Sequence, residues 1–271
     1  MFQLDPADAA PPWAHFEHLP LGLQAGCRLR RSRDGRAVAD WFGCELASAF
    51  QPIVEPISRQ VMGWEAFLRV QGSRDRQLSP WRLFSSAADD YRLMGLDRLC
   101  RTLHLLNALQ VGAPPRLFLN VHGRLLAAVT DDHGKAFRRV VDTLAVDPRG
   151  LVIETPLAAS EQLDLLEFVL GNYRRHGFQV AVNVDSVAQW ERLVRVIQPD
   201  FVKLDSRLLG HPAFGPGLAD LLARRGPPQV ILTHQEGPGS PGTHGATWRQ
   251  GYAYGYPATM PPRGREIAPH R

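Results

Sequence analysis

The sequence predicts an α/β fold, a TIM-like (β/α)8 barrel in which helices surround a closed ring of mostly parallel strands. From residue 50 onward, strand-like apolar runs alternate with helix-like runs, the order that places crossover helices between parallel strands. About eight strand-like runs occur, and a set of about eight fits a closed barrel better than an open sheet. The chain has 271 residues, 44% of them apolar, and a barrel of this class commonly fills about 250 residues.

The expected strands are short runs bounded by turn residues. They lie at residues 49–54, 61–70, 116–121, 150–155, 179–184, 201–205, 229–233 and 251–256. Only the turn from Pro56 to Gln60 separates the first two strands. Because a parallel partner needs a long crossover connection, these two strands must pair antiparallel. The barrel therefore begins with an antiparallel strand that interrupts the regular pattern.

Start signals mark three of the expected helices. The dipeptide Ser79-Pro80 combines an N-cap residue with proline at the first helical position, and its helix extends through Leu106. Ser160 precedes a second run with apolar residues at helical spacing. The segment Ser186-Val-Ala-Gln189 has the S-x-x-Q pattern of a capping box, and predicts a third helix.

The chain divides into a barrel domain at residues 46–262, an N-terminal extension at residues 1–45 and a tail at residues 263–271. Within the extension, Arg33-Asp-Gly35 is the turn signal of a β-hairpin. The arginines around it predict a solvated basic face, with a phosphate or protein contact as the alternative. These arginines are Arg28, Arg30, Arg31, Arg33 and Arg36.

Composition excludes several classes of function. The net charge is only +4 and the basic residues are scattered, so we expect no nucleic-acid partner despite a pI of 9.2. The sequence has no run of about 18 uncharged apolar residues, and its start lacks the features of a secretory signal. Its three cysteines cannot form a disulfide framework, which fits a reducing compartment. We expect a cytoplasmic protein without a membrane span.

Polar residues stand at the end of nearly every expected strand. In a parallel barrel the carboxyl ends of the strands meet at one rim, so these side chains should converge there. They are Asn120, Glu154, Asn183, Asp185, Lys203, Asp205, Thr233 and Glu236, whereas Gln250 precedes the last expected strand. Burying acids, amides and a lysine together costs free energy unless they bind something. The pattern predicts a site for a hard cation or a phosphate.

Five short motifs carry a resemblance to a known family. They are Glu65-Ala-Phe-Leu-Arg69, Leu119-Asn120, Glu154-Thr-Pro156, Lys203-Leu-Asp205 and Gln250-Gly-Tyr252 with Gly255 and Pro257 behind it. In this order they resemble the E-A-L-L-R, L-N, E-I-T-E, K-I-D and Q-G-Y-x-x-G-x-P motifs of the EAL domain family. That family contains phosphodiesterases and receptors of cyclic di-GMP. The resemblance covers about residues 46–260 and implies a barrel of the EAL type.

The resemblance also implies roles for individual residues. In active family members, two divalent cations at the scissile phosphate, Mg or Mn, activate a water and offset charge on the leaving oxygen. By resemblance the metal ligands would be Glu65, Asn120 and Glu154, and the catalytic residues would be Lys203 and Glu236, which are vestigial if the protein is inactive. The nucleotide contacts would be Gln51, Glu65, Arg69, Gln250 and Pro257, with Arg69 forming a fork on a phosphate.

The chain departs from the family where metal binding needs acids. Two adjacent aspartates of the family become Asn183 and Val184, and the family's A-E-G-V-E becomes Leu232-Thr-His-Gln-Glu236. Neutral oxygens replace anionic ones that a divalent cation requires. Asp185 shares the strand parity of Asn183 and could substitute, but Ser186 ends the strand beside it. Asn183 and Asp185 are therefore doubtful metal ligands.

These departures from the family motifs rank three hypotheses about the function of the protein. The first is a degenerate EAL domain of bacterial signalling that needs no cofactor and acts as a cyclic di-GMP receptor or a protein-interaction module. One alternative is an active cyclic di-GMP phosphodiesterase that uses Mg or Mn. The other is an interaction module that binds no nucleotide, and a homodimer stays open. The helical pattern that replaces the family's Gly-rich loop at Ser186 puts the coupling of dimerisation to catalysis in doubt, and Gly237-Pro to Gly245 cannot propagate a helix.

Two simpler interpretations stand beside these hypotheses. Lys203 could be a structural barrel lysine paired with Glu154 instead of a phosphate contact. The histidines do not show a metal-ligand spacing, so we expect them to be scattered and solvated. They are His104, His122, His133, His234 and His244.

Overall fold

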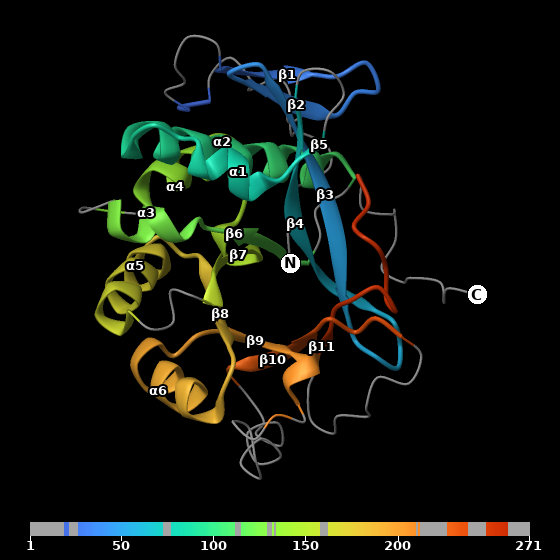
Figure 1. The fold of residues 1–271 in the computed structure, drawn as a ribbon, viewed down its shortest axis with the longest axis vertical. Helices are drawn as coiled ribbons and strands as arrows, with labels where there is room; N and C mark the ends of the chain where they lie inside the picture. Colours follow the sequence, from blue (N-terminus) through green and yellow to red (C-terminus); the bar gives the residue numbers. More distant parts are fainter. Residues whose placement is uncertain are drawn as a thin grey trace.

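The computed structural model shows an eight-stranded barrel, as the sequence predicts. It describes residues 19–21, 27–72, 77–111, 115–128, 132, 134–157, 162–209, 211, 227–237 and 248–259. The barrel strands are β3 (Cys44–Val54), β4 (Val61–Gln71), β6 (Leu117–Asn120), β7 (Leu151–Thr155), β8 (Gln179–Val184), β9 (Phe201–Asp205), β10 (Gln229–Thr233) and β11 (Trp248–Arg249). They follow one another around the ring, and pairing of β3 with β4 closes it (Figure 1).

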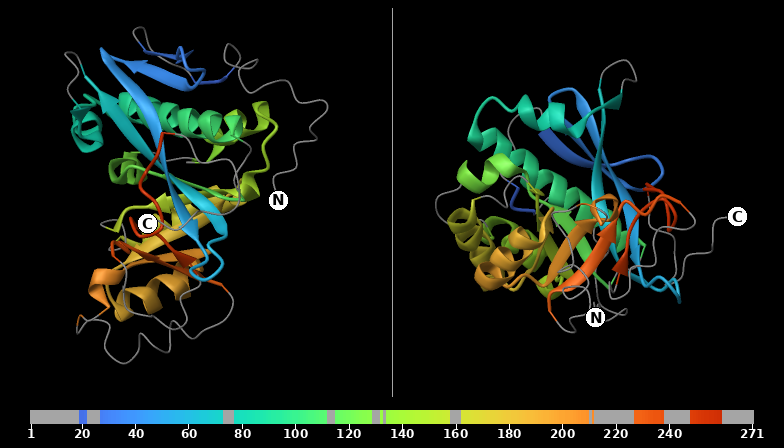
Figure 2. Two further views of the ribbon diagram at one scale, coloured as in Figure 1. Left: turned by 90° about the vertical axis from the view of Figure 1, so that its right-hand side faces the viewer. Right: turned by 60° about the horizontal axis from the view of Figure 1, so that its bottom comes forward.

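The reversed strand is β3, which confirms the predicted antiparallel start. It pairs antiparallel with β4 on one side and with β11 on the other, whereas every other neighbouring pair of the ring is parallel. The register places Gln51 of β3 directly opposite Glu65 of β4. These two long strands run side by side past α2 (Figure 2). The short turn from Pro56 to Gln60 thus determines that Gln51 and Glu65 face each other.

The eighth strand differs from its prediction. It lies at Trp248–Arg249, before the expected segment 251–256, which instead forms a turn. The cause is a close approach of two backbones, because a Cβ added at Gly251 would lie 2.2 Å from the backbone nitrogen of Gln235. A segment that packs this closely and turns back on itself cannot continue a strand ladder.

Six α-helices lie along one side of the barrel in the described part of the chain, on the left in Figure 1. They are α1 (Pro80–Ser85), α2 (Asp90–Gln110), α3 (Gly123–Ala128), α4 (Lys135–Thr143), α5 (Leu163–Arg175) and α6 (Val187–Ile197), with 3-10 turns η2 (Pro148–Gly150) and η4 (Ser206–Leu208). The capping box is confirmed at α6, where Ser186 accepts a hydrogen bond from the backbone of Gln189. Ser160 lies outside the described residues, and α5 begins after Gln162.

The single helix expected from Pro80 through Leu106 is broken into α1 and α2. The side chain of Asp89 accepts a hydrogen bond from the backbone nitrogen of Arg92, so Asp89 caps a new helix start. The apolar periodicity continues through both helices, and it therefore concealed the break.

The predicted N-terminal hairpin is confirmed as β1 (Cys27–Arg31) and β2 (Ala37–Trp41). It extends the barrel sheet, because β2 pairs with β3, and β5 (Gln77–Leu78) pairs with the far end of β4. The basic face of the hairpin is largely neutralised, since Arg28 and Arg30 both bond to Asp40 and Arg30 also pairs with Glu45. The proposed tail at 263–271, and residues 238–247, where a helix seemed lost, lie outside the described residues.

The barrel interior is built in two layers by strand parity. The lower layer is an apolar cluster that includes Phe118, Val152, Ala181, Phe201 and Ile231. Two residues later on each strand, the side chain points to the same side, which places Asn120, Glu154, Asn183, Lys203 and Thr233 above this cluster. The helices pack on the outer face of the strands in a second, larger apolar core. None of the helices in the described ranges is long and apolar enough to cross a membrane.

A buried hydrogen-bond cluster fastens the hairpin to the barrel. The side chain of Asn107 on α2 accepts from the backbone of Ala37 at 2.8 Å, donates to its carbonyl oxygen at 2.9 Å and donates to Ser48 at 3.1 Å. We predict that Asn107→Ala lowers the free energy of unfolding by about 2–3 kcal/mol, because buried backbone groups of Ala37 lose their partners. Chemical denaturation measures this loss. Tyr91→Ala, on the exposed face of the same helix, should change the free energy by less than about 1 kcal/mol, and an equal loss in both variants would contradict the assigned role.

Candidate functional site

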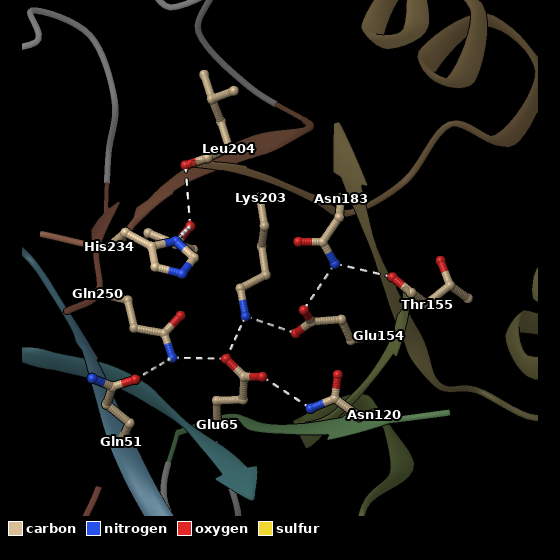
Figure 3. Close-up of polar contacts among 11 residues, drawn as sticks. Gln51, Glu65, Asn120, Glu154, Thr155, Asn183, Lys203, Leu204, His234 and Gln250 are labelled. Atoms are coloured by element: carbon tan, nitrogen blue, oxygen red, sulfur yellow. Dashed lines mark hydrogen bonds and ion pairs between the residues drawn. The ribbon is translucent and has the colours of Figure 1, made fainter. Parts of the chain in front are cut away.

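A cavity of about 380 Å³ opens at the carboxyl ends of the barrel strands. Most residues predicted for the site line it. These are Gln51, Glu65, Arg69, Glu154, Asn183, Lys203, Glu236, Gln250 and Pro257. The structure therefore brings together side chains from β3, β4, β7, β8 and β9 and from the loops that follow β10 and β11 (Figure 3).

Lys203 lies at the centre of the polar layer. Its Nζ donates to Glu65 Oε2 at 2.5 Å and to Glu154 Oε2 at 2.8 Å, and all three residues are buried. The pairing with Glu154 that the sequence offered as an alternative is present, and a second carboxylate joins it. One ammonium group thus links β4, β7 and β9 across the inside of the barrel.

Amide side chains bond the remaining carboxylate oxygens. Asn120 donates to Glu65 Oε1 at 2.9 Å, and Asn183 donates to Glu154 Oε1 at 2.9 Å and to the carbonyl oxygen of Thr155 at 3.0 Å. Gln250 donates to Glu65 Oε2 at 2.7 Å. Each oxygen of both glutamates therefore already accepts a hydrogen bond from a protein donor.

The ion pairs decide the charge states. Burial alone would lower the pKa of Lys203, but the charges and hydrogen bonds of Glu154 and Glu65 raise it above its ordinary value. Burial would raise the pKa of Glu65, yet Lys203, Asn120 and Gln250 lower it. For Glu154, burial and the neighbouring charge of Glu65 prevail and raise the pKa. The ammonium is thus the fixed charge of the cluster, and Glu154 is the carboxyl group that protonates more readily.

The nucleotide contacts implied by the resemblance lie on the cavity wall. Gln51 donates to the carbonyl oxygen of Gly255 at 3.1 Å and accepts from Gln250 at 3.3 Å. Arg69 is exposed, and its guanidinium forms an ion pair with none of the residues that the structure describes. Glu236 and Pro257 line the same cavity from the loops. This wall therefore carries the guanidinium group of Arg69 and the amide groups of Gln51 and Gln250.

Two predicted site residues lie apart from this cavity. Asn120 reaches Glu65 from behind and lines a neighbouring cavity of about 310 Å³ between β4 and α2. Asp185 lies beyond the end of β8, is exposed, and does not line either cavity. Its backbone nitrogen donates to the side chain of Gln189, the capping-box residue, so Asp185 belongs to the start of α6.

Two histidines line the cavities, which the sequence did not predict; His234 is exposed as expected, whereas His104 is not. His104, expected to be solvated, is buried, hydrogen-bonds Ser48 at 2.8 Å and lines the cavity beside α2. Burial and the charge of Arg69 lower its pKa to about 3, so it is neutral. His234 lines the main cavity. The available signal was its position, because a histidine replaces the glycine of the family's A-E-G-V-E motif.

The residues present do not fit a pair of divalent cations. Hard cations need several anionic oxygens that are free to coordinate, and here the buried carboxylates are bonded to Lys203 and to amides. Asn183 turns its amide nitrogen to Glu154, and Asp185 lies elsewhere. In the described ranges no group of three or more His, Cys, Asp or Glu side chains is arranged to hold a metal ion.

Comparison with known proteins agrees with the motifs. The family model of the EAL domain matches residues 38–217. A comparison with curated proteins finds no match.

Solved structures share the fold. The FimX EAL domain from Pseudomonas aeruginosa bound to c-di-GMP superimposes with a TM-score of 0.66 at 17% identity, covering 82% of this chain and 94% of that one. The Klebsiella pneumoniae BlrP1 manganese and c-di-GMP complex gives 0.62 at 20% identity, covering 91% and 64%. The Bacillus subtilis YkuI protein, in complex with c-di-GMP and calcium, gives 0.61 at 19% identity, covering 79% and 55%. The chain therefore spans little more than half of YkuI.

The central ion pair gives a direct prediction. Lys203→Met should lower the free energy of unfolding by about 3–5 kcal/mol at neutral pH, because Glu65 and Glu154 are left buried without their cation. Denaturant unfolding measures the loss. Lys135→Met, at an exposed position of α4, is the matched control and should have little effect. Adding Glu154→Gln to Lys203→Met should restore part of the stability, and a double variant no more stable than the single one would contradict this account.

The same variant should show an altered dependence of stability on pH. Without Lys203, burial and mutual repulsion raise the folded-state pKa of both carboxyl groups above their unfolded values. A group with a raised folded pKa destabilises the fold at pH values above its unfolded pKa, and this penalty disappears below it. The deficit of Lys203→Met relative to wild type should therefore shrink as the pH falls from 7 toward about 4. A deficit that stays constant over this range would contradict the assigned charge states.

Proposed function

Because the chain belongs to the EAL domain family, we propose that its barrel cavity binds cyclic di-GMP without hydrolysing it. The observation that carries the proposal is the double ion pair of Lys203 with Glu65 and Glu154. It leaves a cavity whose fixed cation is an ammonium group and whose carboxylates are held by protein donors. Such a site can bind an anionic ligand, but it lacks the free anionic oxygens that a metal-activated water requires.

The side chains at the expected metal-binding positions disfavour hydrolysis. Two-metal phosphodiester hydrolysis needs one cation to activate water and a second to stabilise the leaving oxygen. The positions that would supply acids carry Asn183, Val184 and Thr233, which offer an amide, a methyl group and a hydroxyl group. Neutral oxygens contribute too little to offset the dehydration of two divalent cations. Asp185, the one candidate substitute, is outside the cavity.

The side chains of the cavity wall favour binding of an anionic ligand. Arg69 offers the planar donor fork that matches a phosphate, and no described carboxylate competes for it. Gln250 is buried on the same wall, where its amide nitrogen is bonded to Glu65 and Gln51. The volume of about 380 Å³ lies within the range of small-molecule sites. FimX, BlrP1 and YkuI, which share the fold, were each solved with c-di-GMP.

Calorimetric titration tests this proposal. We predict that the wild-type protein binds cyclic di-GMP in the presence of a chelator, and that adding Mg or Mn produces no linear dinucleotide. Arg69→Ala should weaken binding by about tenfold or more, because a charge-assisted contact to phosphate is lost. Arg195→Ala, on the exposed face of α6, removes the same charge outside the cavity and should bind like wild type.

The outcomes separate the candidate functions. Metal-dependent linear product that disappears in Glu65→Ala would show an active phosphodiesterase and refute the proposal. Absence of any binding heat, with and without metal, would leave an interaction module that takes no nucleotide. Binding without product supports a receptor.

A further inference from the structure

His234 has a backbone conformation that favours glycine. Its φ angle is +56°, in the left-handed region that few residues other than glycine adopt. In the family motif that the loop resembles, this position is a glycine, whereas here it carries an imidazole. A side chain held in a sparsely populated conformation persists when its surroundings impose it, and such residues cluster at binding sites.

The surroundings do fix the loop. The neighbouring Gln235 exchanges backbone hydrogen bonds with the β11 segment, donating to Gln250 at 3.1 Å and accepting from Ala253 at 2.8 Å. Gly251 packs directly on the backbone of Gln235. From η4, the hydroxyl of Ser206 donates to the carbonyl oxygen of His234 at 3.2 Å. Contacts from Ser206 and from the segment that follows β11 therefore hold the backbone at His234 and Gln235 in place.

The imidazole ring is anchored by one of its two nitrogens. The hydroxyl of Thr233 lies 3.1 Å from His234 Nδ1 and 3.4 Å from the carbonyl oxygen of Leu204. Asp205 Oδ2 lies 3.3 Å from the same ring nitrogen. Both neighbours engage Nδ1, and Nε2 is the ring nitrogen that remains for a ligand. Figure 3 shows this second nitrogen turned toward the side chains of Gln250 and Lys203, inside the cavity.

The charges of the cavity give this nitrogen a role. The lining includes three carboxyl groups, Glu65, Glu154 and Glu236, and two permanent cations, Lys203 and Arg69. Behind the ring, Asp205 is paired with Arg207. An anionic ligand entering this lining meets the imidazole beside the two cations, and a ring nitrogen that carries a hydrogen can donate to it.

We infer that His234 is a ligand-binding residue whose Nε2–H donates to a phosphate oxygen of the bound dinucleotide. This inference rests on the proposed function and adds a contact to it. Asp205 and Thr233 hold Nδ1 from behind, and the hydrogen-bonded backbone fixes the direction in which Nε2 points. The position of a family glycine has thereby become a phosphate contact.

The experiment is calorimetric titration of cyclic di-GMP into the full chain and into His234→Gly. Glycine suits the left-handed conformation, so this variant should keep the thermal stability of wild type while losing the imidazole. We expect binding weaker by about ten- to a hundredfold, the range for one hydrogen bond to a charged group.

Two further variants complete the test. His234→Asn, which also tolerates the left-handed region, should weaken binding as well, and His211→Ala, an exposed histidine outside the cavity lining, should not. Unchanged affinity in a stable His234→Gly variant would overturn the contact while leaving the proposed function intact. If wild type itself does not bind cyclic di-GMP, both proposals fall together.

Discussion

The ammonium group of Lys203 is the constraint on which the barrel interior depends. Two carboxylates and an ammonium from three strands are buried together, and their desolvation is offset only because the contacts are short and the other oxygens are hydrogen-bonded. Shifting β4, β7 or β9 by one residue would move its charge to the outer, apolar face. The ion pair therefore fixes register as well as charge, and the apolar layer with Phe118 and Phe201 beneath it excludes water from below.

The same arrangement determines what the site can bind. The carboxylates of Glu65 and Glu154 are both bonded to Lys203. Beside them, the cavity is lined by the guanidinium of Arg69, the side chain of Gln250 and the ring of His234. These groups come from different strands, so the closed barrel is needed to assemble them. A phosphodiester with hydrogen-bond donors on its bases or sugars matches this combination.

The sequence predicted the parts of the fold that follow from strand parity and chain length. Alternation of side chains was sufficient to place Glu154 and Lys203 at one rim, and the short turn before Val61 was sufficient to reverse β3. Gln250 was expected before the last strand, and it lies at the rim because that strand ends at Arg249. It did not reveal the break between α1 and α2, because a local cap at Asp89 interrupts a continuous apolar pattern. Nor did it reveal the double ion pair or the orientation of His234, since both depend on contacts between residues far apart in the chain.

Asn183 makes two hydrogen bonds that an aspartate at its position could not make. Its amide nitrogen donates to Glu154 and to the carbonyl oxygen of Thr155, and a carboxylate at this position could make neither contact. The amide therefore holds Glu154 in the orientation in which its other oxygen meets Lys203. Replacing Asn183 by aspartate alone would remove this donor and add a third carboxylate beside a single ammonium. The cavity is thus organised around its internal cation.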